Sequence, residues 1–96
     1  MTAEMAAAQS EGQVSIRLLG GFGPLTGNHM TVELDREKPL KEFLDGLAEE
    51  YGLDLNGFGS YFLALIDGVE AGLLGGLEAK VRPGCELLLI RISHGG

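Results

Sequence analysis

The sequence has one cysteine, no tryptophan and no long apolar run. The single cysteine, Cys85, excludes an internal disulfide, a zinc site made only of cysteines and an iron–sulfur cluster held by cysteines. A membrane-spanning helix needs roughly 20 consecutive apolar residues, and no run here approaches that length. Residues 1–12 also lack the basic start and long apolar block of a signal peptide. We therefore expect a cytoplasmic protein that has no membrane partner.

Basic residues are scarce. Seven lysines and arginines stand against 14 aspartates and glutamates, so the net charge is −7. Binding of nucleic acid needs a basic stripe, so we expect no such partner and favour docking on basic protein surfaces. The two histidines, His29 and His94, are far apart in the sequence and lack acidic or thiol ligands beside them, which predicts no metal site.

The length of 96 residues fits one small domain. We expect a disordered, Ala-rich leader over residues 1–13 and one domain over residues 14–96, with a flexible tail at residues 93–96. Residues 14–18 and 30–35 alternate between apolar and polar side chains, which predicts two strands of an opening hairpin.

An amphipathic helix is expected in the middle of the chain. Pro39 stands where the first helical residue belongs, and Gly52 stands where a C-terminal cap belongs. Apolar residues recur between them at helical spacing, at Leu40, Phe43, Leu44, Leu47 and Tyr51.

Two continuous apolar runs follow the helix. Residues 61–66 end at the turn signal Asp67-Gly68, and residues 85–92 form the last strand. Residues 69–77 are expected to hold a short strand and turns. One helix on a mixed sheet of four to five strands is a two-layer α+β arrangement.

With the elements in this order, three stretches resemble one family. They are residues 14–27 with the loop Phe22-Gly23-Pro24-Leu25-Thr26-Gly27, residues 63–68 with their Asp-Gly turn, and residues 81–96 with a closing strand and a Gly-Gly tail. Together they resemble the bacterial sulfur carriers that comprise the small subunit of molybdopterin synthase (MoaD) and the thiamin-pathway carrier (ThiS). That family has the ubiquitin-like β-grasp fold. Cys85 stands where the family usually has an acidic residue, and Arg91-Ile92 stands where the molybdopterin members often have prolines.

The resemblance implies a carrier that is not an enzyme and binds no cofactor. In the family, an adenylating partner of the ubiquitin-activating type uses ATP to activate the last glycine. A sulfur donor such as a cysteine desulfurase then makes a thiocarboxylate, and an acceptor enzyme takes the sulfur. Here Gly96 would be the covalent site, Gly95 would give clearance in a narrow pocket because glycine lacks a Cβ, and Ser93-His94 would be the linker. The favoured acceptor is the large subunit of a molybdopterin or tungstopterin synthase.

The last strand also predicts an apolar face that is free for docking. If Leu87 and Leu89 face the helix, the intervening residues face the other side of the sheet, and an uncovered apolar face usually marks an interface. The predicted partner-binding residues are Leu65, Leu88, Ile90 and Ile92 on this face, and His94 in the tail, where it would donate a hydrogen bond inside a partner's channel. The alternatives are that the leader or a loop covers this face, or that the two faces are exchanged.

Other interpretations stay open. The chain has 16 glycines, so the Gly-Gly ending alone is weak evidence. The same tail would serve a protein modifier joined through Gly96 to lysines, or a thiamin-type carrier, and a plain interaction domain would leave it inert.

Residues 20–23 lack the Gly-Lys-Ser/Thr ending of a phosphate loop, so we expect a turn there. Cys85 is interpreted as a small core residue rather than a reactive thiol.

Overall fold

The computed structural model describes residues 12–22 and 28–92. Most of the predicted leader, residues 23–27 of the first loop, and the predicted site residues His94, Gly95 and Gly96 therefore lie outside the described residues.

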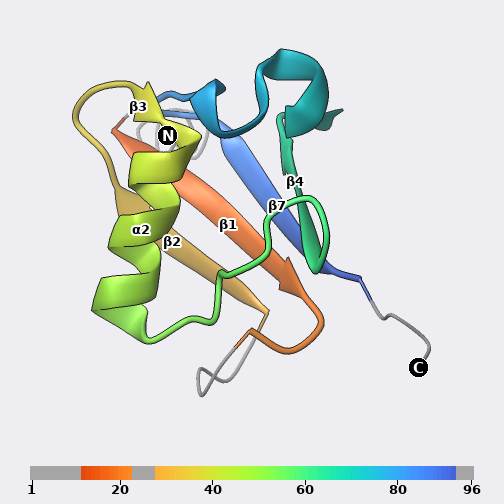
Figure 1. Ribbon diagram of the computed structural model, residues 1–96. Coiled ribbons are helices and arrows are strands. Elements are labelled where there is room, and N and C mark those ends of the chain that lie inside the picture. The colour runs from red at the N-terminus through yellow and green to blue at the C-terminus, as the bar shows by residue number, and fades with distance from the viewer. Residues whose placement is uncertain (1–11, 23–27, 93–96) are drawn as a thin grey trace.

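Five strands form one mixed sheet with the order β2-β1-β7-β4-β5 (Figure 1). The strands are β1 (Gln13–Leu19), β2 (His29–Glu33), β4 (Phe62–Ile66), β5 (Val69–Glu70) and β7 (Glu86–Arg91). β1 runs parallel to β7, and all other neighbours in the sheet are antiparallel. The main helix, α2 (Leu40–Tyr51), packs on one face. The predicted α+β class, with one helix on a mixed sheet of up to five strands, is confirmed.

Helix α2 begins one residue later than predicted. Pro39 has extended backbone angles and is the N-cap, while Leu40 starts the helix and its N–H donates to the Ala79 carbonyl at 2.7 Å. At the other end Gly52 takes the left-handed conformation with φ 70°, and its N–H donates to the Ala48 carbonyl. A left-handed residue costs glycine little because it lacks a Cβ. The predicted cap at Gly52 is confirmed.

The core lies between α2 and the sheet. The helix contributes Leu40, Phe43, Leu44 and Leu47, and these side chains pack against the alternate residues of the three central strands. The strand side chains in this core are Val14, Ile16, Leu18, Phe62, Ala64, Ile66, Leu87 and Leu89. Full burial of one such large aliphatic side chain stabilises the fold by about 1.5–3 kcal/mol.

Two details differ from the sequence-based prediction. β1 begins at Gln13, inside the predicted leader, because Gln13 pairs with Glu33 and accepts a hydrogen bond from the Gly84 N–H. Two short strands, β3 (Lys38–Pro39) and β6 (Lys80–Val81), form a second sheet that the pattern did not predict. The short strand and turns expected over residues 69–77 are confirmed, because β5 is followed by two 3₁₀ turns, η1 (Ala71–Leu74) and η2 (Gly76–Glu78).

No helix in the described part of the chain is both long enough and apolar enough to cross a membrane.

Candidate functional site

The end of β7 is fixed by strands on both sides. β7 lies in the middle of the sheet, with β1 and β4 as hydrogen-bonded neighbours. The pairing with β4 extends to Ile92, whose N–H donates to the Tyr61 carbonyl at 2.8 Å. The residues that precede the predicted tail are therefore part of the rigid sheet.

Arg91, the last residue of β7, joins this strand end to two loops. Its Nε donates to the Gly21 carbonyl at 2.8 Å, and one terminal nitrogen donates to the Asp54 carbonyl at 2.9 Å. Its guanidinium carbon lies 4.4 Å from the centre of the Phe22 ring, within the range of a cation–π interaction. We call this arrangement the Arg91 clamp.

The loop held by the clamp is itself well packed. Phe22 is buried, and its ring meets the ring of Phe62 edge-on at a centroid distance of 5.8 Å. Its carbonyl accepts a hydrogen bond from the Asp54 N–H at 2.6 Å. Gly20 has φ 104°, and a Cβ built there would meet the Arg91 Cβ at 2.4 Å. The absence of a Cβ at Gly20 therefore lets the backbone approach Arg91.

The face of the sheet opposite α2 carries a set of apolar side chains. The side chains of Leu87 and Leu89 are buried on the helix side, as the alternation predicts, so an exchange of the two faces is excluded. Across the other side Leu65 is paired with Leu88, and Leu63 is paired with Ile90. We call this set the outer sheet face. Its members are Leu19, Leu63, Leu65, Leu88, Ile90 and Ile92.

Polar groups border the outer sheet face on the β1 side. Arg17 is paired with Leu88 and is exposed. Next to it the Ser15 hydroxyl and the His29 Nε2 are hydrogen-bonded at 2.9 Å. The outer sheet face is therefore bordered by polar and charged groups on its β1–β2 side and is apolar on its β7–β4 side.

The structure brings together four of the predicted site residues: Leu65, Leu88, Ile90 and Ile92 are half-buried side chains on the β4–β7 side. The sequence reasoning missed Leu19 and Leu63, although both have the same parity along their strands as the predicted residues. It also missed Arg91, for which no local pattern gave a signal.

Cys85 lies in the core, as predicted. Its side chain is 6% exposed, on the same side of the sheet as Leu87 and Leu89. Burial raises the pKa of the Cys85 thiol above its usual value, and the nearby Asp67 carboxylate acts in the same direction. Because the thiolate is the nucleophilic form, this thiol is kept protonated and shielded. Within residues 12–22 and 28–92, no group of three or more histidine, cysteine or acidic side chains is arranged to hold a metal ion.

Two solved structures share this fold. The solution structure of Urm1 from Trypanosoma brucei matches with a TM-score of 0.64 and 16% identity, over 88% of this chain and 96% of that one. The solution structure of the small archaeal modifier protein 1 (SAMP1) from Methanosarcina acetivorans matches with a TM-score of 0.59 and 17% identity, over the same shares of the two chains. No protein-family model matches the sequence, and no curated protein matches it. The two structures establish a ubiquitin-like β-grasp fold.

Proposed function

We propose that this protein is a sulfur carrier that reacts through the carboxylate of Gly96. The observation that carries the proposal is the position of β7. This central strand of a ubiquitin-like sheet leads directly into the last residues, which end in Gly95-Gly96. A partner can bind the rigid sheet and receive the residues beyond it in a narrow channel.

The proposed chemistry has two steps. A partner enzyme of the ubiquitin-activating type joins the Gly96 carboxylate to the AMP moiety of ATP and releases pyrophosphate. Hydrosulfide then attacks the carbonyl carbon of this mixed anhydride, the C–O bond to AMP breaks, and a thiocarboxylate remains on Gly96. When the donor is a desulfurase persulfide, its outer sulfur attacks the same carbonyl carbon and displaces AMP, which gives an acyl disulfide. A thiol then attacks the desulfurase sulfur of this acyl disulfide, forms a disulfide with it and releases the same thiocarboxylate. The chain is a cosubstrate in both steps, and it acts in the cytoplasm.

The outer sheet face is the proposed docking surface for the adenylating partner. It is continuous with the end of β7, because Ile90 and Ile92 belong to it and Arg91 lies between them. Apolar side chains that are only partly buried favour a protein contact. The exposed Arg17 at its border would orient the partner through charge.

For the acceptor we propose the large subunit of a molybdopterin or tungstopterin synthase. What supports this is the length of the domain and the resemblance of the loop over residues 22–27 to the first hairpin of that small subunit. Arg91, which holds the loop after β1, departs from these members, because they often have proline at its position. A thiamin-type acceptor is the alternative within this class.

Intact-mass analysis tests the proposal. The purified protein is incubated with ATP, a candidate adenylating enzyme and sulfide. We expect first that the mass of the untreated protein shows Gly96 as the terminal residue, and then a gain that equals one exchange of oxygen for sulfur. A variant without Gly96 should show no gain. Gly46→Ala, a substitution at an open position in α2, is the matched glycine control and should show the full gain.

A second candidate is a protein modifier, which the name of the archaeal neighbour favours. Trypsin cleaves after Arg91, so a lysine joined to Gly96 would keep residues 92–96 as a remnant. Finding this remnant on lysines of other proteins in cell extracts would establish the modifier. The absence of this remnant, together with the mass gain described above, would exclude the modifier function and support the sulfur-carrier function. A chain that shows neither product with any adenylating enzyme of its cell would be a plain interaction domain.

A further inference from the structure

A groove with basic side chains lies at the end of the sheet where β7 begins. It has a volume of about 320 Å³ and is lined by Ile66, Asp67, Val69, Leu74, Lys80 and Arg82. We call it the basic groove. In Figure 1 this end carries η1 and β6, and β7 runs from there to the opposite end, where the Arg91 clamp lies.

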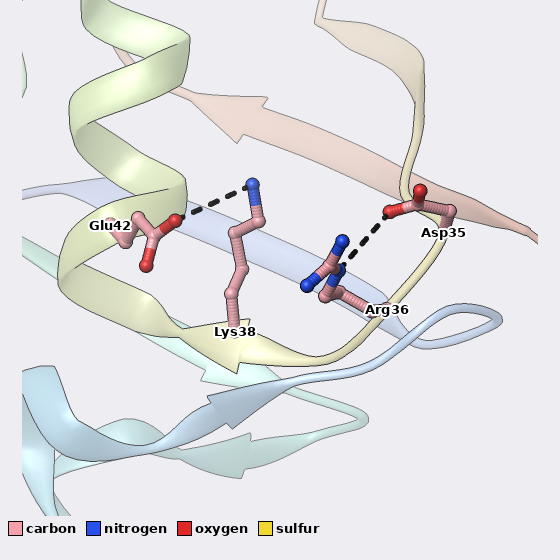
Figure 2. A network of polar contacts seen from close by, with 4 residues as sticks. All are labelled: Asp35, Arg36, Lys38 and Glu42. Atoms are coloured by element: carbon pink, nitrogen blue, oxygen red, sulfur yellow. Dashed lines mark ion pairs between the residues drawn. The ribbon is translucent and has the colours of Figure 1, made fainter.

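The two cations of the basic groove differ from most other cations in the described part of this acidic protein, which lie beside carboxylates. Around the start of α2, Lys38 is paired with Glu42, and Arg36 lies beside Asp35 (Figure 2). Lys41 is paired with Asp45 at 3.2 Å.

Lys80 and Arg82 are exposed, and neither has an ion pair or hydrogen bond from its side chain among the described residues. Their own groove contains one carboxylate, that of Asp67, whose Oδ1 accepts the Glu86 N–H at 2.9 Å. Two cations against one carboxylate leave the groove positive, although the chain as a whole is negative.

Apolar side chains surround these cations. Val69 is 41% exposed and Leu74 is 46% exposed, and the neighbouring Leu73 is 78% exposed. The 3₁₀ turn η1 that presents both leucines is held in shape by Glu70, whose carboxylate accepts the Gly72 N–H at 3.1 Å. Such a cluster of accessible leucines is costly in water and usually marks a contact surface.

We infer that the basic groove is a docking site for a short segment of a partner protein that carries one or two carboxylate side chains between aliphatic residues. The carboxylates would be bound by Lys80 and Arg82, and the aliphatic side chains would cover Val69 and Leu74. Arginine binds carboxylates through two parallel hydrogen bonds. Nucleic acid does not fit, because a groove with two cations next to apolar residues offers no basic stripe for a phosphate backbone.

The position of this site gives it a separate role. The basic groove and the Arg91 clamp lie at opposite ends of β7. A partner in the groove would leave the outer sheet face near Ile90 and Ile92 accessible to the adenylating enzyme. The site therefore goes beyond the proposed function, and its occupant can be tested without any tail chemistry.

The test is a titration of the ¹⁵N-labelled full chain with a blocked peptide, acetyl-Leu-Asp-Glu-Leu-amide, followed by backbone amide shifts. We expect saturable shifts confined to residues 66–74 and 80–86, lost at high salt. The isosteric peptide acetyl-Leu-Asn-Gln-Leu-amide should bind at least about tenfold more weakly, since it lacks the charge. Replacing Lys80 and Arg82 together by glutamine should weaken the binding of the acidic peptide by about the same factor.

Matched controls decide between outcomes. Lys41→Gln removes one cation on α2 and should leave peptide binding unchanged. Leu74→Ser should weaken binding several-fold while the spectrum stays that of a folded protein, because this side chain is exposed. Equal binding of the acidic and neutral peptides, the same shifts with inorganic phosphate alone, or no saturable shift with the acidic peptide would each overturn the inference.

Discussion

The guanidinium carbon of Arg91 lies 4.4 Å from the centre of the Phe22 ring. These residues are far apart in the sequence, yet their contact closes the end of the sheet at which β7 stops. The same guanidinium also bonds the carbonyls of Gly21 and Asp54, so one side chain holds the loop after β1 and the loop after α2. The strand end therefore has a fixed position relative to the core.

Replacing Arg91 by alanine should lower the free energy of unfolding by about 1.5 kcal/mol, because two charge-assisted hydrogen bonds and one cation–π contact are lost from a half-exposed site. Arg91→Lys should recover less than half, since an ammonium cannot donate to both carbonyls in the same fork. Urea unfolding followed by circular dichroism measures both. Arg17→Ala, at an exposed arginine on β1, is the control and should change stability by less than about 0.5 kcal/mol. Equal effects of the two alanine variants would contradict the clamp.

Gly20→Ala should destabilise the protein by at least about 2 kcal/mol. Its φ of 104° is unfavourable for alanine, and the added Cβ would meet the Arg91 Cβ at 2.4 Å. The adjacent Gly21→Ala is the matched control, because its Cβ meets nothing within 4 Å. We expect Gly21→Ala to be neutral or slightly stabilising, since it restricts the unfolded chain. A thermal melt that ranks the two variants in the opposite order would show that the loop does not approach Arg91 closely.

Cys85 should react with a thiol reagent about a hundredfold more slowly in the native protein than in urea, because the reagent must wait for local opening. The raised pKa of the thiol also predicts a pH effect on stability. Its contribution is fully present below the unfolded-state pKa near 9.0 and is lost as the pH rises through the higher native pKa, since the unfolded chain ionises first. Unfolding curves between pH 8 and pH 11 measure this loss, and Cys85→Ala should lack it. A native thiol that reacts as fast as the unfolded one would mark Cys85 as a reactive site.

On the outer sheet face, Leu88→Ser should raise the KM of the proposed adenylating enzyme for this protein by about tenfold and leave kcat nearly unchanged. Leu88 is half-buried beside Leu65 and Arg17, so its loss removes a binding contact rather than the reacting group. ATP–pyrophosphate exchange measures both constants. Glu49→Gln, on the exposed side of α2, should change neither. A fall in kcat alone would place the effect of Leu88 in the chemical step and exclude a docking role.

The sequence predicts the elements whose periodicity is strong. Helix α2 and the alternation along β7 follow from apolar spacing, and the glycine cap at Gly52 follows from its place after the last apolar turn. The pair of two-residue strands β3 and β6 could not be predicted, because pieces so short carry no period.

The candidate site is predictable only in part. The face of the sheet on which Leu65 and Leu88 lie could be derived from adjacent residues of the same strand. The partners of Arg91 could not, because they are backbone carbonyls 70 and 37 residues away and carry no side-chain signature. The basic groove could not be predicted either, because Val69 and Arg82 are brought to the same groove only by the turns between them.

The pairing of β7 also has a mechanical consequence. A pull on residue 92 along the strand direction would load the ladders with β1 and β4 in shear, so their hydrogen bonds would resist together instead of opening one after another. An enzyme that draws the last residues into its channel could therefore detach β7 only by breaking both hydrogen-bonded ladders at the same time. A pull on the end of the chain would then move the whole domain toward the proposed partner, because the sheet would not unfold strand by strand.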